Sequence, residues 1–444
     1  MSGTADRAGP SLAFAAARTA LPAPQAGQGV QAARAAEGTG GDFSGRCFLF
    51  LQGPASPFGF RLARTLAGRG ARIVKVHLCG GDLVFWPARA RLFRGRPQDW
   101  PTYLERLMAE EAVSDVVLFG DCRPYHAPAV RLGHARGLRL HLLEEGYVRP
   151  GWITCERRGV NAHSDLPRAP ESLREVAVTV AEPPSRAPLP EPFPRRAMWD
   201  VAWHAGFAAL APLFHRYRRH TLAHPAVDYA GWIVRWLNSN SATKRDRTAR
   251  ARLGEGVSYF LLPLQLEGDY QMRAHSSFRS VEEVVRLVLA SFARSAPAGA
   301  VLAVKRHPYD TSLPATRRKV ERVAAEFGLT ERVVFIEGGD IEPLVKASAG
   351  VVLVNSTTAL QALRHNKPLK VLGRATYDMP GLAHQGPLDG FWHEAAAPDP
   401  RLVEAYRRVV LARTQIAGGF FAPAAIERAV VGLVARMAEE ARPA

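Results

Sequence analysis

Short apolar runs that stop at glycine and polar residues recur along this chain of 444 residues and constrain its fold more than any other feature. Cys47–Leu51 ends at Gln52-Gly53-Pro54, and Asp115–Phe119 ends at Gly120-Asp121. Segments with helical spacing of apolar residues, such as Phe58–Gly68, separate these runs. Buried strands that alternate with helices over short turns predict a parallel sheet covered by helices on both faces.

The same pattern occurs in two units. Further strands are expected in the first unit at Arg72–Leu78 and Leu138–Leu143, and in the second at Val257–Leu262, Ala300–Lys305, Val333–Ile336, Gly350–Val354 and Leu369–Leu372. We therefore predict an α/β protein with two Rossmann-like domains. The expected division is 1–45 as a disordered tail, 46–176 and 253–395 as the two domains, 177–252 as a linker with basic, Trp-rich amphipathic helices, and 396–444 as C-terminal helices.

The N-terminal tail is rich in Ala, Gly and Arg and shows little periodicity. A signal peptide is the alternative, with Arg7 as its charged region and Leu12–Ala17 as its apolar one. That apolar run is short and Arg18 interrupts it, which favours a disordered tail. No run approaches the roughly 18 apolar residues that span a bilayer. Phe207–Phe214, the longest candidate, is too short and contains Pro212.

The net charge of +17 points to an anionic partner: nucleic acid, a membrane surface or a substrate. Basic residues interleave with Trp and Leu on expected helices between Arg195 and Arg252, and no nucleic-acid module is present, so nucleic acid ranks last. These helices suit an anionic membrane interface, although ordinary helices with a solvated charged face fit equally well. The four cysteines are widely spaced without a CxxC pair, which favours reduced thiols in the cytoplasm.

Two strand ends in the second unit have residues that suit a phosphate group. Lys305-Arg306-His307-Pro308 closes one strand, and the proline keeps the histidine in an extended conformation at the carboxyl edge of the sheet. Asn355-Ser356-Thr357-Thr358 lies between a strand and a helix, where hydroxyl groups, free N–H groups and the helix dipole favour an anion. Together they predict a nucleotide-phosphate site.

The first unit has acidic strand ends. Glu144-Glu145-Gly146-Tyr147 closes one strand, and a carboxylate facing a cleft can act as a base or a nucleophile. Arg149 follows and is able to hold one carboxylate ionised. Asp121-Cys122-Arg123-Pro124-Tyr125-His126 closes the preceding strand, with simple helix capping by Asp121 as the alternative. No GxGxxG, P-loop, HExxH or GxSxG motif and no metal-ligand cluster is visible.

These motifs, in this order, resemble the capsular polysaccharide biosynthesis and export family. The resemblance covers roughly 46–393, and it also includes Gly81-Asp82, Trp152–Glu156, Gly159-Val160-Asn161, Leu264-Gln265 with Asp269, and Tyr377-Asp378. The acidic, His-Pro and Ser-Thr segments are also similar to motifs of bacterial CMP-sialic-acid transferases.

The resemblance implies a GT-B architecture, in which two Rossmann-like domains face a cleft. It implies transfer of Kdo from CMP-Kdo to phosphatidylglycerol or its lyso form, at the cytoplasmic face of the inner membrane, with other capsule assembly proteins as further partners and without a permanent cofactor or metal. The implied catalytic residues are Glu144, Glu145 and His307. The implied nucleotide-binding residues are Gln265, Lys305, Arg306, His307, Pro308, Asn355, Ser356 and Thr357, and the implied acceptor residues are Gln52, Asp82, Asp121, Arg123, His126 and Arg149.

The role of the acidic residue stays open at this point. The sialyltransferases invert the anomeric configuration, whereas Kdo transferases of this family are thought to retain it. The carboxylate at 144 or 145 is therefore a base, a nucleophile or an electrostatic stabiliser. A GT-B enzyme with another nucleotide sugar is a second reading of the same motifs. A non-catalytic capsule assembly or export factor is the third.

Overall fold

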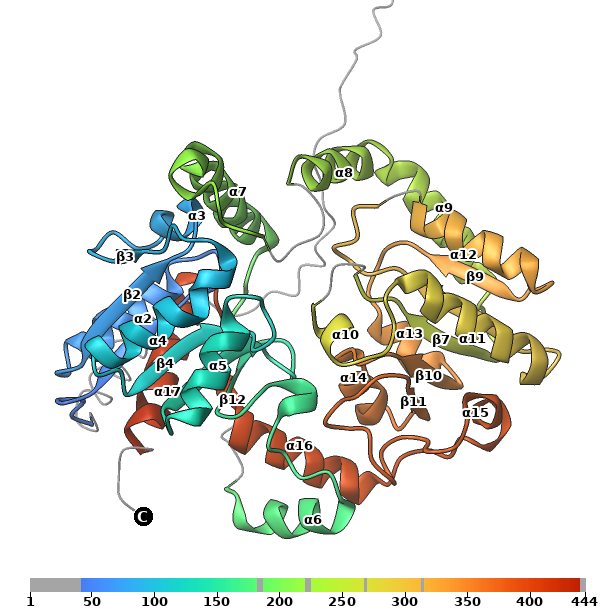
Figure 1. Ribbon diagram of the computed structural model, residues 1–444. Coiled ribbons are helices and arrows are strands. Elements are labelled where there is room, and N and C mark those ends of the chain that lie inside the picture. The colour runs from blue at the N-terminus through green and yellow to red at the C-terminus, as the bar shows by residue number, and fades with distance from the viewer. Residues whose placement is uncertain (1–40, 182–186, 220–224, 267–269, 313–314, 440–444) are drawn as a thin grey trace, which may run out of the picture. The chain divides into compact units, whose positions relative to one another are not determined.

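The computed structural model describes residues 41–439, except 182–186, 220–224, 267–269 and 313–314. Most of the predicted tail, including the segment considered as a signal peptide, lies outside the described residues, as does Asp269. The described chain contains two α/β lobes, each built around its own sheet (Figure 1).

The first lobe has a seven-stranded sheet in the order β12-β6-β5-β4-β1-β2-β3. Its strands are parallel except for β6, which runs antiparallel to both neighbours. They are β1 (Cys47–Phe50), β2 (Arg72–His77), β3 (Arg91–Leu92), β4 (Asp115–Phe119), β5 (Arg139–Glu145), β6 (Trp152–Glu156) and β12 (Gln415–Ala417).

The second lobe has a five-stranded, entirely parallel sheet in the order β11-β10-β7-β8-β9. Its strands are β7 (Tyr259–Pro263), β8 (Val301–Lys305), β9 (Val333–Ile336), β10 (Gly350–Leu353) and β11 (Leu369–Val371). Because parallel strands need crossover connections, helices separate them in sequence.

The helices of the chain fall into three stretches. Those of the first lobe are α2 (Phe58–Ala67), α3 (Gly80–Val84), α4 (Trp100–Glu110), α5 (His126–Ala135) and α6 (Pro170–Thr179). Between the lobes in sequence are α7 (Phe193–Ala209), α8 (Pro225–Leu237) and α9 (Ser239–Ala251). The remainder are α10 (Tyr270–Ala274), α11 (Val281–Ser295), α12 (Ala315–Glu326), α13 (Glu342–Ala347), α14 (Thr358–Arg364), α15 (Leu388–Glu394), α16 (Pro400–Thr414) and α17 (Pro423–Glu439), with short 3-10 helices at Pro97–Asp99, Asn161–His163 and Ala211–Phe214.

Both faces of each sheet are buried. Along β4, Val116 and Leu118 belong to one apolar core while Val117 and Phe119 belong to the core on the opposite face. Strand residues alternate in this way because successive side chains point to opposite faces. Helices cover both faces of the second sheet in the same manner. The predicted α/β class, with two Rossmann-like domains of the GT-B type, is confirmed.

The end of the chain returns to the first lobe. Helix α17 contributes Ile426, Val430 and Leu433 to the core that contains Phe48. Arg46 donates a hydrogen bond of 2.8 Å to the Met437 carbonyl, and β12 pairs with β6. The sequence analysis expected helices here but neither β12 nor this placement, because a strand of three residues has no periodicity to detect.

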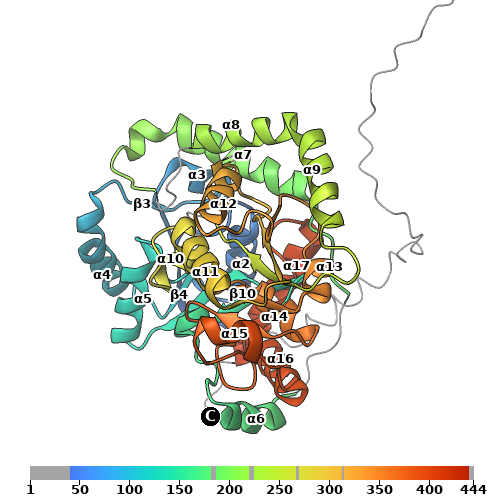
Figure 2. The same ribbon diagram turned by 90° about the vertical axis from the view of Figure 1, so that its right-hand side faces the viewer.

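The helices between the lobes pack on both of them. On α7, the Trp203 ring lies so close to α3 that a Cβ added to Gly81 would be 2.4 Å from it. On α9, the Asp246 carboxylate accepts 2.6 Å hydrogen bonds from the backbone N–H groups of Glu337 and Gly338, beyond β9. Figures 1 and 2 both show α7 and α8 along one side of the chain. None of the described helices is long and apolar enough to cross a bilayer.

Candidate active site

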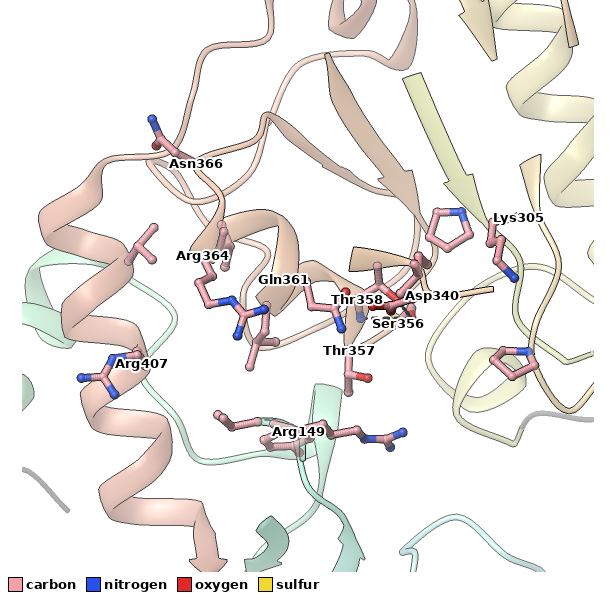
Figure 3. A pocket seen from close by; sticks show the side chains of 18 of the residues that line it. Arg149, Lys305, Asp340, Ser356, Thr357, Thr358, Gln361, Arg364, Asn366 and Arg407 are labelled. Carbon is pink, nitrogen blue, oxygen red and sulfur yellow. Dashed lines mark hydrogen bonds between the residues drawn. The ribbon is translucent and has the colours of Figure 1, made fainter. Parts of the chain in front are cut away.

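A cavity of about 770 Å³ lies at the carboxyl ends of the strands of the second sheet. Segments that follow β7, β8, β9 and β10 form one wall, and Tyr147, Val148 and Arg149 of the first lobe form another, together with residues of α16. Ligands of parallel α/β sheets bind at this edge because the loops after the strands converge there. Figure 3 shows Arg149 across the cavity from Thr357.

His307 lines the cavity as a neutral imidazole. Its Nδ1 accepts a 3.1 Å hydrogen bond from the backbone N–H of Tyr309, so the proton of the neutral ring resides on Nε2. Burial lowers the pKa of His307 to about 4, and the nearby positive charges of Arg149 and Lys305 act in the same direction. At neutral pH the side chain is therefore a hydrogen-bond donor without a charge.

Lys305 and Arg306 bring positive charge to the same strand end. Both are buried, and the Lys305 ammonium donates a 3.1 Å hydrogen bond to the Arg306 carbonyl. Burial, with the neighbouring guanidinium groups of Arg306 and Arg250, lowers the pKa of Lys305 to about 8, although Asp246 opposes the shift. Arg306 donates from Nε to the Glu337 carbonyl at 3.3 Å, while its buried Nη1 has no partner among the described residues. Such an arrangement favours an anionic ligand.

Gln265 and Asn355 join two strand ends. The Gln265 amide donates to Asn355 Oδ1 at 2.8 Å and accepts from the Asn355 backbone N–H at 3.1 Å, which ties the loop after β7 to the loop after β10. These two residues are not among those that line the cavity. Ser356 and Thr357 do line it, as does Pro308.

The Ser356 segment presents hydroxyl groups. Ser356 Oγ accepts a hydrogen bond from the Thr358 backbone N–H at 3.2 Å, and the buried Tyr377 hydroxyl donates to the Ser356 carbonyl at 2.7 Å. Helix α14, which begins at Thr358, has only seven residues. Its dipole is correspondingly small, and the hydroxyl groups are the stronger feature of this strand end.

The two adjacent glutamates leave β5 in different surroundings. Glu145 forms a 3.1 Å ion pair with Arg196 of α7. Glu144 lies beside Gly120 and the Arg123 guanidinium: a Cβ added to Gly120 would be 3.2 Å from Glu144 Oε2 and 3.5 Å from Arg123 Nε. Neither glutamate is among the residues that line the cavity, although Tyr147, two residues after Glu145, is.

Three of the other residues predicted for the acceptor lie in different surroundings. Arg149 lines the cavity and donates from Nε to the Gly146 carbonyl at 3.0 Å. Asp121 accepts from His163 Nδ1 at 3.0 Å and from the Val160 N–H at 3.2 Å. His126 is buried, with Nδ1 2.9 Å from the Phe119 carbonyl, and therefore holds the end of β4.

Gln52 and Asp82 belong to a separate buried network. The Gln52 amide donates to Asp82 Oδ1 at 2.9 Å, and Asp82 Oδ2 accepts from the Leu78 N–H at 2.9 Å at the start of α3. Neither side chain lines the 770 Å³ cavity. Their contacts are those of residues that shape the first lobe.

Sequence reasoning did not identify several cavity residues. Asp340 follows β9, and Tyr406 and Arg407 come from α16. Asp340 was recognisable as the polar end of a predicted strand. The two residues of α16 were not recognisable from the sequence, because only the folding of the chain brings this helix to the cavity.

Comparison with known proteins places the chain in a family. The family model described as "Capsule polysaccharide biosynthesis protein" matches residues 114–421. The chain belongs to this family, which confirms the resemblance seen in the motifs.

Two curated relatives cover most of the chain. It is 35% identical over 380 residues to the capsule polysaccharide export protein KpsS of Escherichia coli, covering 84% of this chain and 96% of that protein. It is 34% identical over 395 residues to the capsule polysaccharide modification protein LipB of Neisseria meningitidis, covering 84% of this chain and 91% of the relative.

The chain also matches a solved structure over most of its length. The β-Kdo 2,7-transferase of Thermosulfurimonas dismutans KpsC matches with a TM-score of 0.43 and 13% identity, over 88% of this chain and all of that one.

Proposed function

We propose that this chain is a glycosyltransferase of capsule biosynthesis that transfers Kdo from CMP-Kdo to phosphatidylglycerol or its lyso form. The observation that carries the proposal is the convergence of Lys305, Arg306 and His307 with the hydroxyl groups of Ser356 and Thr357 on one cavity of about 770 Å³. This volume lies within the range of about 300–1,000 Å³ that is usual for small-molecule sites.

The donor site supplies leaving-group stabilisation from its side chains. As the bond between Kdo and the phosphate breaks, negative charge grows on the phosphate oxygens of CMP. The neutral His307 donates from Nε2–H to one such oxygen, and the Lys305 ammonium stabilises the charge. Arg149 lines the cavity across from Thr357, and we assign it to pair with the carboxylate of the Kdo residue.

On the acceptor side we assign Glu144 rather than Glu145 to the reaction. Glu145 pairs with Arg196 of α7, while Glu144 lies near Gly120 and Arg123 at the loop after β4, which also carries the Asp121-Cys122 segment. Its role as base, nucleophile or electrostatic stabiliser depends on the stereochemical course.

The helices between the lobes support a peripheral position on the inner face of the membrane. Large apolar side chains on α8 are exposed, including Ile233 at 60%, Trp236 at 69% and Leu237 at 67%. The Tyr229 hydroxyl donates a 3.1 Å hydrogen bond to Asp200, which joins α8 to α7, where Met198 is also exposed. Exposed cations lie on the neighbouring segments: Arg216, Arg218, Lys244 and Arg247. Apolar and cationic groups together suit an anionic lipid surface.

Helix α8 also contacts the donor site directly. Arg235 donates a hydrogen bond to the Pro308 carbonyl, next to His307. A lipid-binding helix in this position would hold the acceptor near the nucleotide.

The description of KpsS as an export protein favours one competing function, a non-catalytic capsule export factor. Incubation of the purified chain with CMP-Kdo and lysophosphatidylglycerol distinguishes the two. We expect release of CMP and a Kdo-lipid product detected by mass spectrometry.

His307→Ala should lower kcat/KM by about 10²–10³-fold, the usual effect of losing a charge-stabilising donor. His393→Ala, which changes an exposed histidine of α15, is the control and should have no effect. Lipid binding without CMP release by the wild-type chain would favour the export factor, and stabilisation by UDP but not CMP would favour another donor.

A further inference from the structure

Four side chains with metal-binding groups meet outside the donor cavity. Asp121 and Cys122 follow β4, His163 ends a 3-10 helix of the first lobe, and His275 follows α10 in the second lobe. One ligand atom from each lies within 4.8 Å of the other three. We refer to these residues as the Asp-Cys-His-His cluster.

The spacing of the cluster is close to that of a tetrahedral zinc site. Zinc bonds of about 2.0–2.3 Å place neighbouring ligand atoms about 3.3–3.6 Å apart. Cys122 Sγ is 3.9 Å from His163 Nδ1 and 3.9 Å from His275 Nε2, and Asp121 Oδ2 is 3.0 Å from His163 Nδ1. The three printed separations lie within about 0.6 Å of the zinc-site spacing, and none of the ligand atoms is more than 4.8 Å from another, so side-chain adjustments would bring all four around one ion.

The cluster is partly buried and incompletely satisfied. His275 is fully buried and Asp121 is 4% exposed. Among the described residues, His275 Nδ1 and Asp121 Oδ1 have no hydrogen-bond partner.

The backbone around the cluster is well fixed. The His275 carbonyl accepts a 2.8 Å hydrogen bond from the Arg374 N–H. Asp121 Oδ2 accepts from the Val160 N–H at 3.2 Å, which ties the loop after β4 to the turn that presents His163. Ligands held in this way lose little freedom when they bind an ion.

We propose that the Asp-Cys-His-His cluster binds one zinc ion that joins the first lobe to the second. The thiolate of Cys122 and the carboxylate of Asp121 would balance the two positive charges of the ion, and the histidines would complete the four ligands. A set of four protein ligands is typical of structural zinc sites, which keep no open position for a substrate. Because His275 alone comes from the second lobe, the ion would restrain the separation of the lobes. This differs from the expectation from sequence of no metal, since Cys122 is 41 residues from His163 and 153 from His275.

Cobalt substitution tests the site without reference to transferase activity. The full chain is stripped with a chelator and titrated with Co²⁺. We expect one equivalent to bind, with the intense visible bands of tetrahedral Co²⁺ and a thiolate-to-cobalt charge-transfer band in the near ultraviolet; Zn²⁺ should displace it. No absorption, or only the weak spectrum of six-coordinate cobalt, would overturn the proposal.

Variants assign the ligands. Cys122→Ser should remove the charge-transfer band, while Cys155→Ala, which removes another cysteine of the first lobe, should retain it. His275→Ala should weaken Zn²⁺ binding at least tenfold and abolish the rise in Tm that Zn²⁺ causes in the wild-type chain, whereas His384→Ala should behave like the wild type. Circular dichroism checks that each variant is folded. If a variant does not fold, the cobalt titration of the wild-type chain still tests the proposal. Persistence of the charge-transfer band in Cys122→Ser would refute the assignment. A chain that binds zinc but does not release CMP would refute only the proposed transferase function.

Discussion

At the scale of single residues, the cavity of about 770 Å³ contains two basic groups that respond differently to pH. Burial lowers the pKa of His307 to about 4, so its imidazole stays neutral throughout the physiological range. Burial also lowers the pKa of Lys305, but only to about 8, so its ammonium is charged at neutral pH and loses its proton just above it. The cavity therefore loses one positive charge as the pH rises through about 8, and Lys305 alone of this pair is responsible.

This difference predicts the pH dependence of nucleotide binding. Between pH 7.5 and 9.5 the phosphate of CMP is already a dianion, while free Lys305 becomes neutral. We expect the affinity for CMP, measured by calorimetry, to fall progressively above pH 8, approaching tenfold per pH unit. Lys305→Met should bind CMP more weakly at pH 7.5 and show little further change, whereas Lys346→Met, on the exposed face of α13, should behave like the wild type. An undiminished pH dependence in Lys305→Met would exclude this lysine as the titrating group.

At the scale of elements, α8 combines exposed apolar side chains with a hydrogen bond from Arg235 to the carbonyl of Pro308, which lines the cavity. Its outer residues recur at helical spacing: Val227, Ile233, Val234 and Leu237, with Trp236 beside them. A helix with this pattern either packs on a partner or lies in a membrane interface. The pattern was visible in the sequence, but the choice between these outcomes depends on exposure, which only the three-dimensional structure provides.

The membrane proposal predicts a specific loss on changing α8. Ile233→Ser combined with Trp236→Ser should reduce flotation with phosphatidylglycerol-containing vesicles at least tenfold, since each large apolar side chain contributes about 1.5–3 kcal/mol when fully buried. Leu287→Ser is a matched control, because Leu287 is 45% exposed on α11 in the second lobe. Wild-type binding should weaken with added salt because exposed cations contribute to it. Equal flotation of the double variant, or binding that ignores lipid charge, would argue against the role of α8.

At the scale of the whole molecule, local pattern and long-range assembly differ in how far sequence predicts them. The parallel strands β4 and β8 and their polar ends were predicted, because burial on both faces leaves continuous apolar runs in the sequence. The domain boundaries remain a prediction. The short strands β6 and β12, the cavity residues of α16 and the meeting of His275 with Cys122 were not predicted. They depend on contacts between distant segments, and in a single sequence such contacts leave no periodicity.

The packing of the C-terminal helix α17 in the core of the first lobe gives a prediction at this scale. Leu433 lies near the C-terminus, yet it is fully buried in the same core as Phe48 of the first strand, whereas Val431 on the same helix is 41% exposed. If α17 completes the first lobe, Leu433→Ala should lower the free energy of unfolding by about 2–5 kcal/mol through lost burial and a cavity, and Val431→Ala should change it by less than about 0.5 kcal/mol. Urea denaturation followed by circular dichroism and tryptophan fluorescence measures both. Equal stability of the two variants would mean that α17 is an appendage rather than part of the core. A selective loss in Leu433→Ala would show instead that the last helix of the chain is part of the core of the first lobe.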